Sequence, residues 1–299
     1  MFQNILVPLD GSVLAERALA PAMALAEAVQ GRVTLLCSPQ VQPMSIDDYS
    51  GGYSWWWPEQ AQERACEASA EYLSALAERW AREGVAIQTR VTEGDTASVL
   101  VDTAATLDAD LIAMSTHGYS GVTRWVLGSV TEKVLRSAPC PVLVIRDARS
   151  INSVVITLDG SALAEKALEP GLEVARRLGA TATFLHVATP EPLPEEIVQR
   201  WEGMERGEGE AKEAEIYLET VRSQDEAEHS GVIGIVVVEG PPAQRIVEFV
   251  EAHPVDLVVM ATHGRTGLRR WAYGSVSEKV LRGSQRSMLI VRPPAHDLA

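Results

Sequence analysis

Two copies of one glycine-containing segment hold the residues whose types and spacing best suit phosphate chemistry. The first reads S-T-H-G-Y-S-G-V-T-R-W-V-L-G-S-V from Ser115, and the second reads A-T-H-G-R-T-G-L-R-R-W-A-Y-G-S-V from Ala261. The copies stay aligned without a gap to Arg146 and Arg292, with 16 of 32 positions identical. Glycines between a buried strand and a helix start let backbone amides surround a phosphate. The repeat therefore predicts two similar anion or nucleotide sites, one in each half of the chain.

The glycines and serines of each copy have distinct expected roles. Gly118 permits a close backbone approach that a side chain would block, and Gly128 and Ser129 open a helix whose free amides and dipole attract an anion. The second copy repeats these residue types at Gly264, Gly274 and Ser275. Tight loop packing without a ligand is the alternative interpretation, and the doubled, fixed spacing favours binding.

A second repeated motif, L-D-G-S, places Asp10 and Asp159 directly after the first expected strand of each half. One interpretation is a carboxylate that contacts a base or ribose, or a phosphate-bound metal through water. The other is a turn residue or helix cap, which is a common use of Asp before Gly-Ser. Because the glycine segment recurs in the same half, we favour the binding role.

His117 and His263 precede the glycines in the two copies. No second His, Cys or paired carboxylate follows at metal-ligand spacing, so a backbone or local hydrogen bond is expected rather than general-base catalysis. Arg124 and Arg270 match between the copies and suit either a phosphate or an ion pair on the following helix. No catalytic triad, Walker-type lysine or zinc set is recognisable, and the sequence leaves open whether the chain is an enzyme.

The elements that must position these residues alternate between short apolar strands and helices. This alternation predicts an α/β fold in which a parallel sheet is covered by helices on both faces. Ligands bind such sheets beyond the carboxyl ends of the strands, so the aspartate and glycine motifs are expected to converge. The expected strands are Ile5–Leu9, Val33–Cys37, Val85–Val91, Leu111–Met114, Val142–Ile145, Val154–Thr157, Thr181–Val187, Ile233–Val238, Leu257–Met260 and Met288–Val291. The expected helices of the first half are Ala15–Ala28, Glu59–Glu83, Ala97–Leu107 and Ser129–Ser137.

The internal duplication and the length of 299 residues predict two tandem domains, residues 1–147 and 152–299. The short polar junction between them favours halves that pack together. The first half carries a longer connection, residues 38–58, with three consecutive tryptophans at Trp55–Trp57. We interpret it as a loop that packs on its own domain, with an exposed aromatic patch for a partner or a ligand lid as the alternative.

Charge and hydropathy restrict the classes of partner. A net charge of −15 and a pI near 4.9 disfavour nucleic acid. No apolar run is long enough to cross a bilayer and no secretion signal opens the chain, which favours a cytoplasmic protein without a membrane partner. Residues 195–229 hold 12 acidic and 4 basic residues, typical of a solvated helix face, with a docking surface for an unknown basic protein partner as the alternative. Three scattered cysteines are expected to be buried, reduced thiols.

Taken together, these motifs resemble the universal stress protein family, in particular its tandem two-domain members. Family domains that bind ATP carry G-x-x-G, nine residues and then G-[ST]. Both segments follow this pattern, except that Ser115 and Ala261 replace the first glycine. The opening I-L-V-P-L-D-G-S and the later P-C-P-V-L-V-I-R are also similar to the family, so the resemblance covers essentially the whole chain.

The resemblance implies an open five-stranded parallel sheet in each domain, Rossmann-like and of the adenine nucleotide alpha hydrolase-like type. It implies ATP (or AMP or ADP) at the strand ends, with Mg²⁺ held by the phosphates and no direct protein ligand. It also implies that the last strands of the two domains pair as an intramolecular pseudo-dimer, and it allows a homodimer. The implied nucleotide contacts are Pro8, Leu9, Asp10, Cys37, Ser38, Ser115, His117, Gly118, Gly128, Ser129 and Val130, and then Thr157, Leu158, Asp159, His186, Val187, Ala261, His263, Gly264, Gly274, Ser275 and Val276.

The leading hypothesis is an ATP-binding stress-response or regulatory protein with at most slow ATP hydrolysis. One alternative is a nucleotide-free scaffold for protein interactions, against which the intact Gly118, Gly128 and Ser129 set argues. The other is an enzyme that uses ATP for adenylyl or phosphoryl transfer, for which the sequence offers no additional catalytic Lys or His set.

Overall fold

The computed structural model describes residues 1–39, 44–47, 53–56, 59–115, 127–147, 149–189, 210–228, 233–262 and 274–292. The elements of the first half are β1 (Asn4–Leu9), α1 (Val13–Glu16), α2 (Leu19–Val29), β2 (Arg32–Cys37), β3 (Met44–Asp47), β4 (Tyr53–Trp56), α3 (Glu59–Arg79), β5 (Ala86–Val91), α4 (Thr96–Thr106), β6 (Leu111–Ser115), α5 (Ser129–Ser137) and β7 (Val142–Ile145). Those of the second half are β8 (Ser153–Leu158), α6 (Ala162–Glu165), α7 (Leu168–Leu178), β9 (Thr181–Ala188), α9 (Glu210–Glu228), β10 (Ile233–Glu239), α10 (Pro242–Ala252), β11 (Leu257–Ala261), α11 (Ser275–Gly283) and β12 (Ser287–Val291).

The main strands form one continuous sheet in the order β10-β9-β8-β11-β12-β7-β6-β1-β2-β5. Within each half, five strands run parallel, and the register of the first two strands is the same in both halves. The order reverses between β1 and β6 in the first half and between β8 and β11 in the second. These reversals are the points at which open parallel sheets bind ligands. The predicted α/β fold with its mostly parallel sheet is confirmed.

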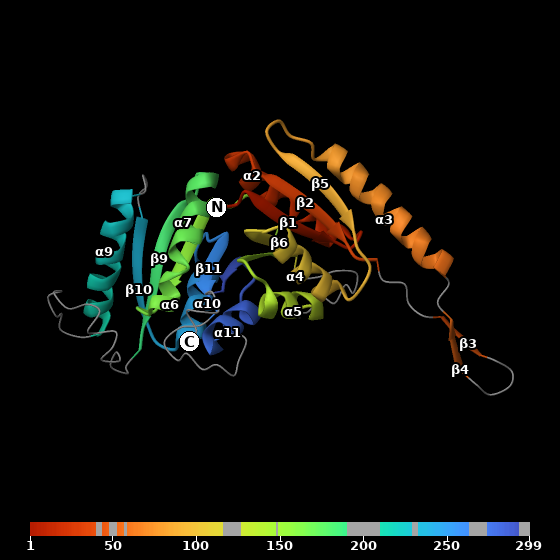
Figure 1. The fold of residues 1–299 in the computed structure, drawn as a ribbon. Helices are drawn as coiled ribbons and strands as arrows, with labels where there is room; N and C mark the ends of the chain where they lie inside the picture. The colour runs from red at the N-terminus through yellow and green to blue at the C-terminus, as the bar shows by residue number, and fades with distance from the viewer. Residues whose placement is uncertain are drawn as a thin grey trace.

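The two halves join where β7 and β12 pair antiparallel, with Leu143 opposite Leu289. Both strands are buried along their whole length. The last strand of each half therefore covers what would otherwise be an open sheet edge, and the two halves share one sheet (Figure 1).

Helices cover both faces of this sheet and form two hydrophobic cores. The helices α2, α3, α7 and α9 pack on one face, and α4, α5, α10 and α11 pack on the other. Because successive residues of a strand point to opposite faces, the strands contribute to both cores in alternation. On β2, for example, Leu35 lies in the first core and Leu36 in the second. Burial on both faces explains why the strands read as continuous apolar runs.

Two predicted helices differ from the structure by more than one residue at an end. The helix expected over Ala15–Ala28 is broken into α1 and α2, because Pro21 lacks the N–H that would bond to the carbonyl four residues earlier, and it is tolerated in the first turn of α2. The helix expected to reach Glu83 ends at Arg79. Gly84, with φ +81°, belongs to a turn before β5 instead of ending the helix.

The connection between β2 and α3 is also different from the expected loop. It contains a hairpin in which β3 and β4 pair antiparallel, with Ser45 opposite Trp55. Trp57 lies outside the described residues. The acidic α9 packs through Tyr217 and Leu218 against the sheet, which agrees with the interpretation of a helix with a solvated face. Among the described residues, no helix is both long enough and apolar enough to span a bilayer.

Candidate functional site

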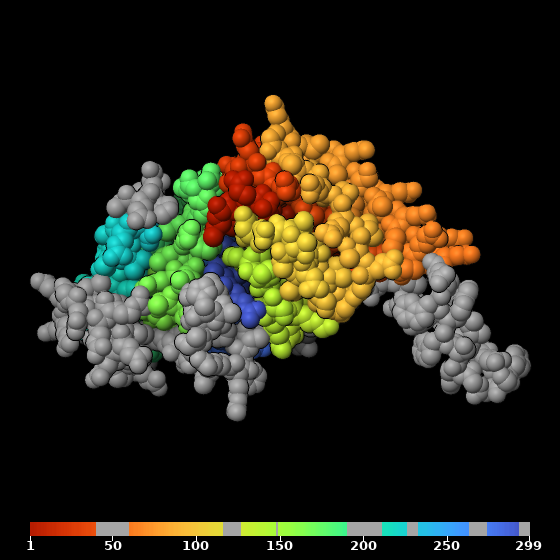
Figure 2. Space-filling model, in the orientation of Figure 1, coloured from red at the N-terminus to blue at the C-terminus, as the bar shows by residue number. Residues whose placement is uncertain are grey.

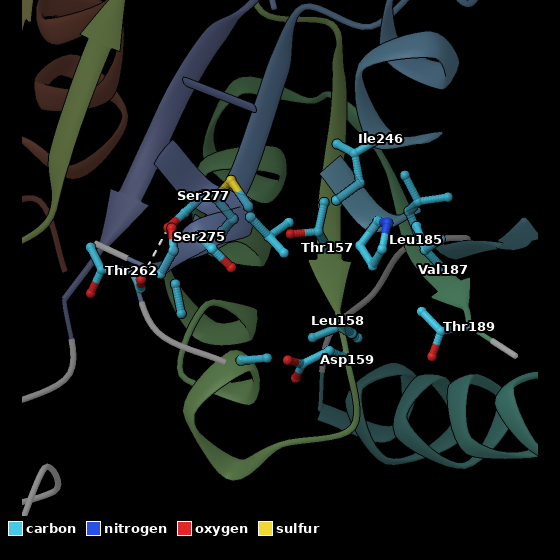
Figure 3. A pocket seen from close by; sticks show the side chains of 16 residues that line it. Thr157, Leu158, Asp159, Leu185, Val187, Thr189, Ile246, Thr262, Ser275 and Ser277 are labelled. Atoms are coloured by element: carbon cyan, nitrogen blue, oxygen red, sulfur yellow. Dashed lines mark hydrogen bonds between the residues drawn. The ribbon is translucent and has the colours of Figure 1, made fainter. Parts of the chain in front are cut away.

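A cavity of about 250 Å³ lies at the carboxyl ends of β8, β9 and β11, at the point where the strand order of the second half reverses. Helices α10 and α11 complete its walls (Figure 3). Its size approaches the lower end of the roughly 300–1,000 Å³ that small-molecule sites occupy. The residues that line it are Thr157, Leu158, Asp159, Ala164, Leu185, Val187, Thr189, Pro242, Ile246, Met260, Ala261, Thr262, Gly274, Ser275, Val276 and Ser277.

The polar end of the cavity is the start of α11. Gly274 is the N-cap residue, and it has no side chain that could accept a hydrogen bond from the first-turn amides. The Ser277 hydroxyl donates to the carbonyls of Thr262 and Gly274, both at 3.0 Å, and Gly274 N–H donates to Thr262 as well. These bonds hold the helix start against the end of β11. Amides without a side-chain cap and the positive end of the helix dipole make this end suitable for an anion.

Three other helices have a capping side chain, whereas α2, α7 and α10, like α5 and α11, have none. Ser12, Asp95 and Ser161 cap α1, α4 and α6 by accepting a backbone N–H with a side-chain oxygen. Gly128 and Gly274, at the starts of α5 and α11, provide no such acceptor. Their φ values of −61° and −63° are open to any residue, so glycine contributes the missing side chain rather than an unusual backbone conformation.

Asp159 lies on the floor of the cavity and also builds the turn after β8. Its Oδ1 accepts the backbone N–H of Ser161 at 3.0 Å and the Ser161 hydroxyl at 2.6 Å. Ser161 Oγ in turn caps α6 through the Ala164 N–H at 3.1 Å. The turn interpretation of this aspartate is therefore correct. The same carboxylate lines the cavity, so the turn is compatible with a ligand contact.

The opposite end of the cavity is apolar. Leu185 and Val187 contribute from β9, and Ile246 from α10. The hydroxyl of Thr157, which replaces the Pro8 of the first half, donates to the carbonyl of Val259 at 3.3 Å and so is used within the sheet. One end of the cavity therefore offers backbone donors and the other offers a hydrophobic surface.

His186 has a different position from its neighbours on β9. Successive residues of a strand point to opposite faces, so the His186 ring lies in the other core while Leu185 and Val187 face the cavity. It is fully buried and meets Tyr217 edge-on, with ring centroids 6.2 Å apart. Its side chain is not among those that line the cavity.

Those predicted residues of the first half that the structure describes have the same arrangement. Asp10 Oδ1 accepts the N–H of Ser12 at 2.9 Å, as Asp159 does for Ser161. Pro8, Leu9 and Cys37 end β1 and β2 in the register of their counterparts, and Ser115 ends β6 as Ala261 ends β11. Gly128, Ser129 and Val130 start α5. Both substitutes for the first motif glycine are thus in extended strand backbone, which a Cβ tolerates.

The two halves differ at the end of their second strands. Ser38 follows β2, and its hydroxyl donates to the carbonyl of Gly94 at 3.2 Å, whereas Val187 provides an apolar side chain at the matching position. Burial is the largest cause that raises the pKa of Cys37, the residue before Ser38. Asp95, the N-cap residue of α4, forms a 3.4 Å ion pair with Lys133 on α5. The matching N-cap residue of α10 in the second half is Pro241.

Some predicted residues are not placed, and some lining residues were not predicted. His117, Gly118, His263 and Gly264 lie outside the described residues. Sequence reasoning missed the contributions of α10 and of Ser277. A repeated E-G dipeptide was available as a signal. Its glycines, Gly94 and Gly240, match between the halves, both have φ near +130°, and they precede α4 and α10. In the described part of the chain, no group of three or more His, Cys, Asp or Glu side chains suits a metal.

Comparison with known proteins identifies relatives of both halves. The model of the universal stress protein family matches residues 1–146 and again 150–292. A universal stress protein of Methanocaldococcus jannaschii is 32% identical over 146 residues, 49% of this chain and 83% of the relative. One of Mycolicibacterium smegmatis is 27% identical over 296 residues, 97% of both chains. The crystal structure of an Archaeoglobus fulgidus universal stress protein has a TM-score of 0.72 at 19% identity, and covers 98% of this chain and 99% of that one, which is a likeness of fold.

Proposed function

Since this chain belongs to the universal stress protein family, with two tandem copies of the family domain, we propose that it binds an adenine nucleotide in each half and acts as a regulatory stress-response protein. One observation carries the proposal. The cavity of the second half combines a helix start without a side-chain cap at one end with an apolar wall at the other.

The phosphates are assigned to the start of α11. Its N-cap glycine offers no side-chain acceptor to the first-turn amides, and the exposed Ser275 lies beside them. Ser277 also lines the cavity, but its hydroxyl is already bonded to the carbonyls of Thr262 and Gly274. An anion at this position gains both hydrogen bonds and the attraction of the helix dipole.

The base is assigned to the apolar end, against Leu185, Val187 and Ile246. A flat aromatic base there removes hydrophobic surface from water at about 25 cal/mol per Å². Asp159 lies between the two ends, and its carboxylate is suited to accept a hydrogen bond from a ribose hydroxyl. The order phosphate, ribose and base then follows the cavity from α11 to β9.

We propose the equivalent site in the first half, at the ends of β1, β2 and β6 and the start of α5. The shared register of β1 with β2 and β8 with β9 supports this, as does the matching glycine cap of α5. Ser38 in place of Val187 makes the wall of this site more polar. The two sites are therefore expected to differ in affinity.

The residues present fit Mg²⁺ as a companion of the phosphates rather than as an independently held ion. Asp159 and Asp10 each use one carboxylate oxygen for a turn, and the described residues hold no cluster of ligands that would retain the metal alone. Bound Mg²⁺ neutralises phosphate charge. The role of the chain's own residues is to hold the nucleotide, and we propose at most slow hydrolysis.

The experiment that tests the proposal is mass spectrometry of the nucleotide released from freshly purified, denatured protein, followed by calorimetric titration of the stripped protein with ATP and Mg²⁺. We expect adenine nucleotide and a stoichiometry of two per chain. Ser129→Glu and Ser275→Glu should each leave one tight site, because either carboxylate repels phosphate from a helix start. A stripped wild-type protein that binds no adenine nucleotide contradicts the proposal and favours an interaction scaffold.

A further inference from the structure

Arg146, the residue after β7, connects the first half to the end of a helix in the second half. Its side chain is buried, and the guanidinium donates to the carbonyl of Ser284 at 2.6 Å and to that of Leu281. Both carbonyls lie at the C-terminal end of α11, where backbone acceptors have no partner within the helix. The positive charge also complements the negative end of the helix dipole.

Arg292, the residue after β12, makes the reciprocal contact. Its Nη1 donates to the carbonyl of Arg136, in the last turn of α5. Arg146 and Arg292 hold matching positions in the repeat, and the strands that lead into them are antiparallel neighbours. Each half therefore anchors the C-terminal end of the other half's helix.

Other contacts show that α5 and α11 lie together at the junction of the halves. Arg282 of α11 approaches Glu132 of α5 at 4.0 Å, and the two helices are neighbours at the centre of the molecule (Figure 1). Figure 2 shows yellow-green atoms of the first half against blue atoms of the second half there. Near Arg146, a carboxylate oxygen of Glu251 accepts a hydrogen bond from the Ser284 hydroxyl at 3.0 Å. Burial lowers the pKa of Arg146 to about 10 and Glu251 opposes the shift, so the guanidinium is charged at neutral pH.

The opposite ends of these two helices are the starts assigned above to phosphate. Helix α11 has nine residues, about 13 Å, and such a short helix moves as one hydrogen-bonded body. A change at its C-terminal end therefore shifts the amides of its first turn. We propose that Arg146 is a positioning residue for the nucleotide site of the second half, and Arg292 for that of the first half. This inference rests on the proposed function, and it makes nucleotide affinity in each half depend on the other.

The test measures each site separately. Ser129→Glu weakens the first site, so that the tight binding measured is that of the second site, and Ser275→Glu does the reverse. In each background, Arg146→Met and Arg292→Met are titrated with ATP and Mg²⁺ by calorimetry. We expect Arg146→Met to weaken the second site about tenfold, which lies within the roughly 5- to 150-fold range usual for coupling between sites. The affinity of the first site should change by less than about twofold. Arg292→Met should show the reverse pattern.

A matched control separates positioning from general loosening of the junction. Arg177, on α7, also crosses between the halves, donating to the carbonyl of Ala28 at 3.2 Å, and this bond involves neither α5 nor α11. Arg177→Met should leave both affinities within about twofold of their parents, well below the usual coupling range. Arg146→Lys retains the charge but cannot donate to both carbonyls as the guanidinium does, so it should weaken the second site less than Arg146→Met. The lysine variant also provides the measurement if the methionine variant fails to fold.

The outcomes are distinguishable. Equal losses at both sites, or no loss at either site, overturn the positioning role while the proposed function stands. If wild type and both parent proteins, Ser129→Glu and Ser275→Glu, fail to bind ATP, the proposed function is overturned, and the inference with it. The inference is supported if each arginine variant, Arg146→Met or Arg292→Met, weakens ATP binding only at the site in the other half, while Arg177→Met leaves both affinities unchanged.

Discussion

Replacing Ser275 with glutamate should separate nucleotide affinity from stability, because the two respond with opposite signs at the start of α11. The side chain of Ser275 is exposed, and Gly274 before it provides no cap. A carboxylate here complements the helix dipole, which stabilises the fold by about 0.3–1 kcal/mol. The same carboxylate lies close to the position assigned to phosphate.

The loss of affinity can be worked from Coulomb's law. Two unit charges about 5 Å apart, at an effective dielectric constant of about 40 between protein surface and water, repel by about 1.7 kcal/mol. The helix dipole, already complemented by the glutamate, contributes about 0.3–1 kcal/mol less to the phosphate. The total of about 2–2.7 kcal/mol corresponds to a roughly 30- to 100-fold weaker site.

The assay is calorimetric titration with ATP and Mg²⁺ in the Ser129→Glu background, with thermal unfolding measured on the same samples. Ser275→Ala is the control. It removes one hydroxyl and keeps the backbone amides, so we expect a loss below about tenfold. The reasoning is refuted if Ser275→Glu binds ATP as tightly as its parent, or if alanine and glutamate weaken binding equally.

Three further predictions concern stability and reactivity. Tyr217→Phe and Tyr72→Phe each lose a phenol hydrogen bond to a helix glutamate, 3.1 and 3.2 Å long. Each should lower the free energy of unfolding, measured with urea, by about 0.5–1.5 kcal/mol. No change in either variant would exclude a stabilising bond. Gly31→Ala places a Cβ 2.9 Å from a backbone carbonyl oxygen, so it should destabilise by about 1–3 kcal/mol, and a neutral result would show that the backbone yields. Burial raises the pKa of Cys140 to about 12, so this thiol should resist iodoacetamide at a pH of about 8 until the protein is unfolded, whereas rapid native labelling would contradict its burial.

The duplicated patterns made most of the strand framework predictable. Apolar runs such as Val142–Ile145 are buried on both faces, and a strand of this kind is recognisable without knowledge of its neighbours. The start of α5 at Ser129 was also predictable, because a Gly-Ser pair after a loop and before a helical pattern is a local signal. Helix breaks were harder. The role of Pro21 was readable in principle, yet the alanine-rich sequence around it favoured one continuous helix.

The expectation of buried thiols illustrates the limit of composition. Cys37 and Cys140 are buried, but Cys66 on α3 is half-buried and lies 3.4 Å from a carboxylate oxygen of Glu93. Nothing near Cys66 in the sequence distinguishes it, because its exposure depends on how α3 lies over β5. The hairpin of β3 and β4 was missed although its first strand, Met44–Asp47, alternates apolar and polar residues, because each strand has only four residues.

The sequence by itself determined the duplication, the alternation of strands and helices, the family and the candidate phosphate-binding helix starts, since these depend on patterns within a few residues of one another. Only the tertiary structure decided which side chains share a cavity. It brought α10 to the second site, turned His186 to the opposite face and extended Arg146 to the end of α11. Those outcomes depend on strand order, pleat and the pairing of β7 with β12, which act between residues far apart in the chain.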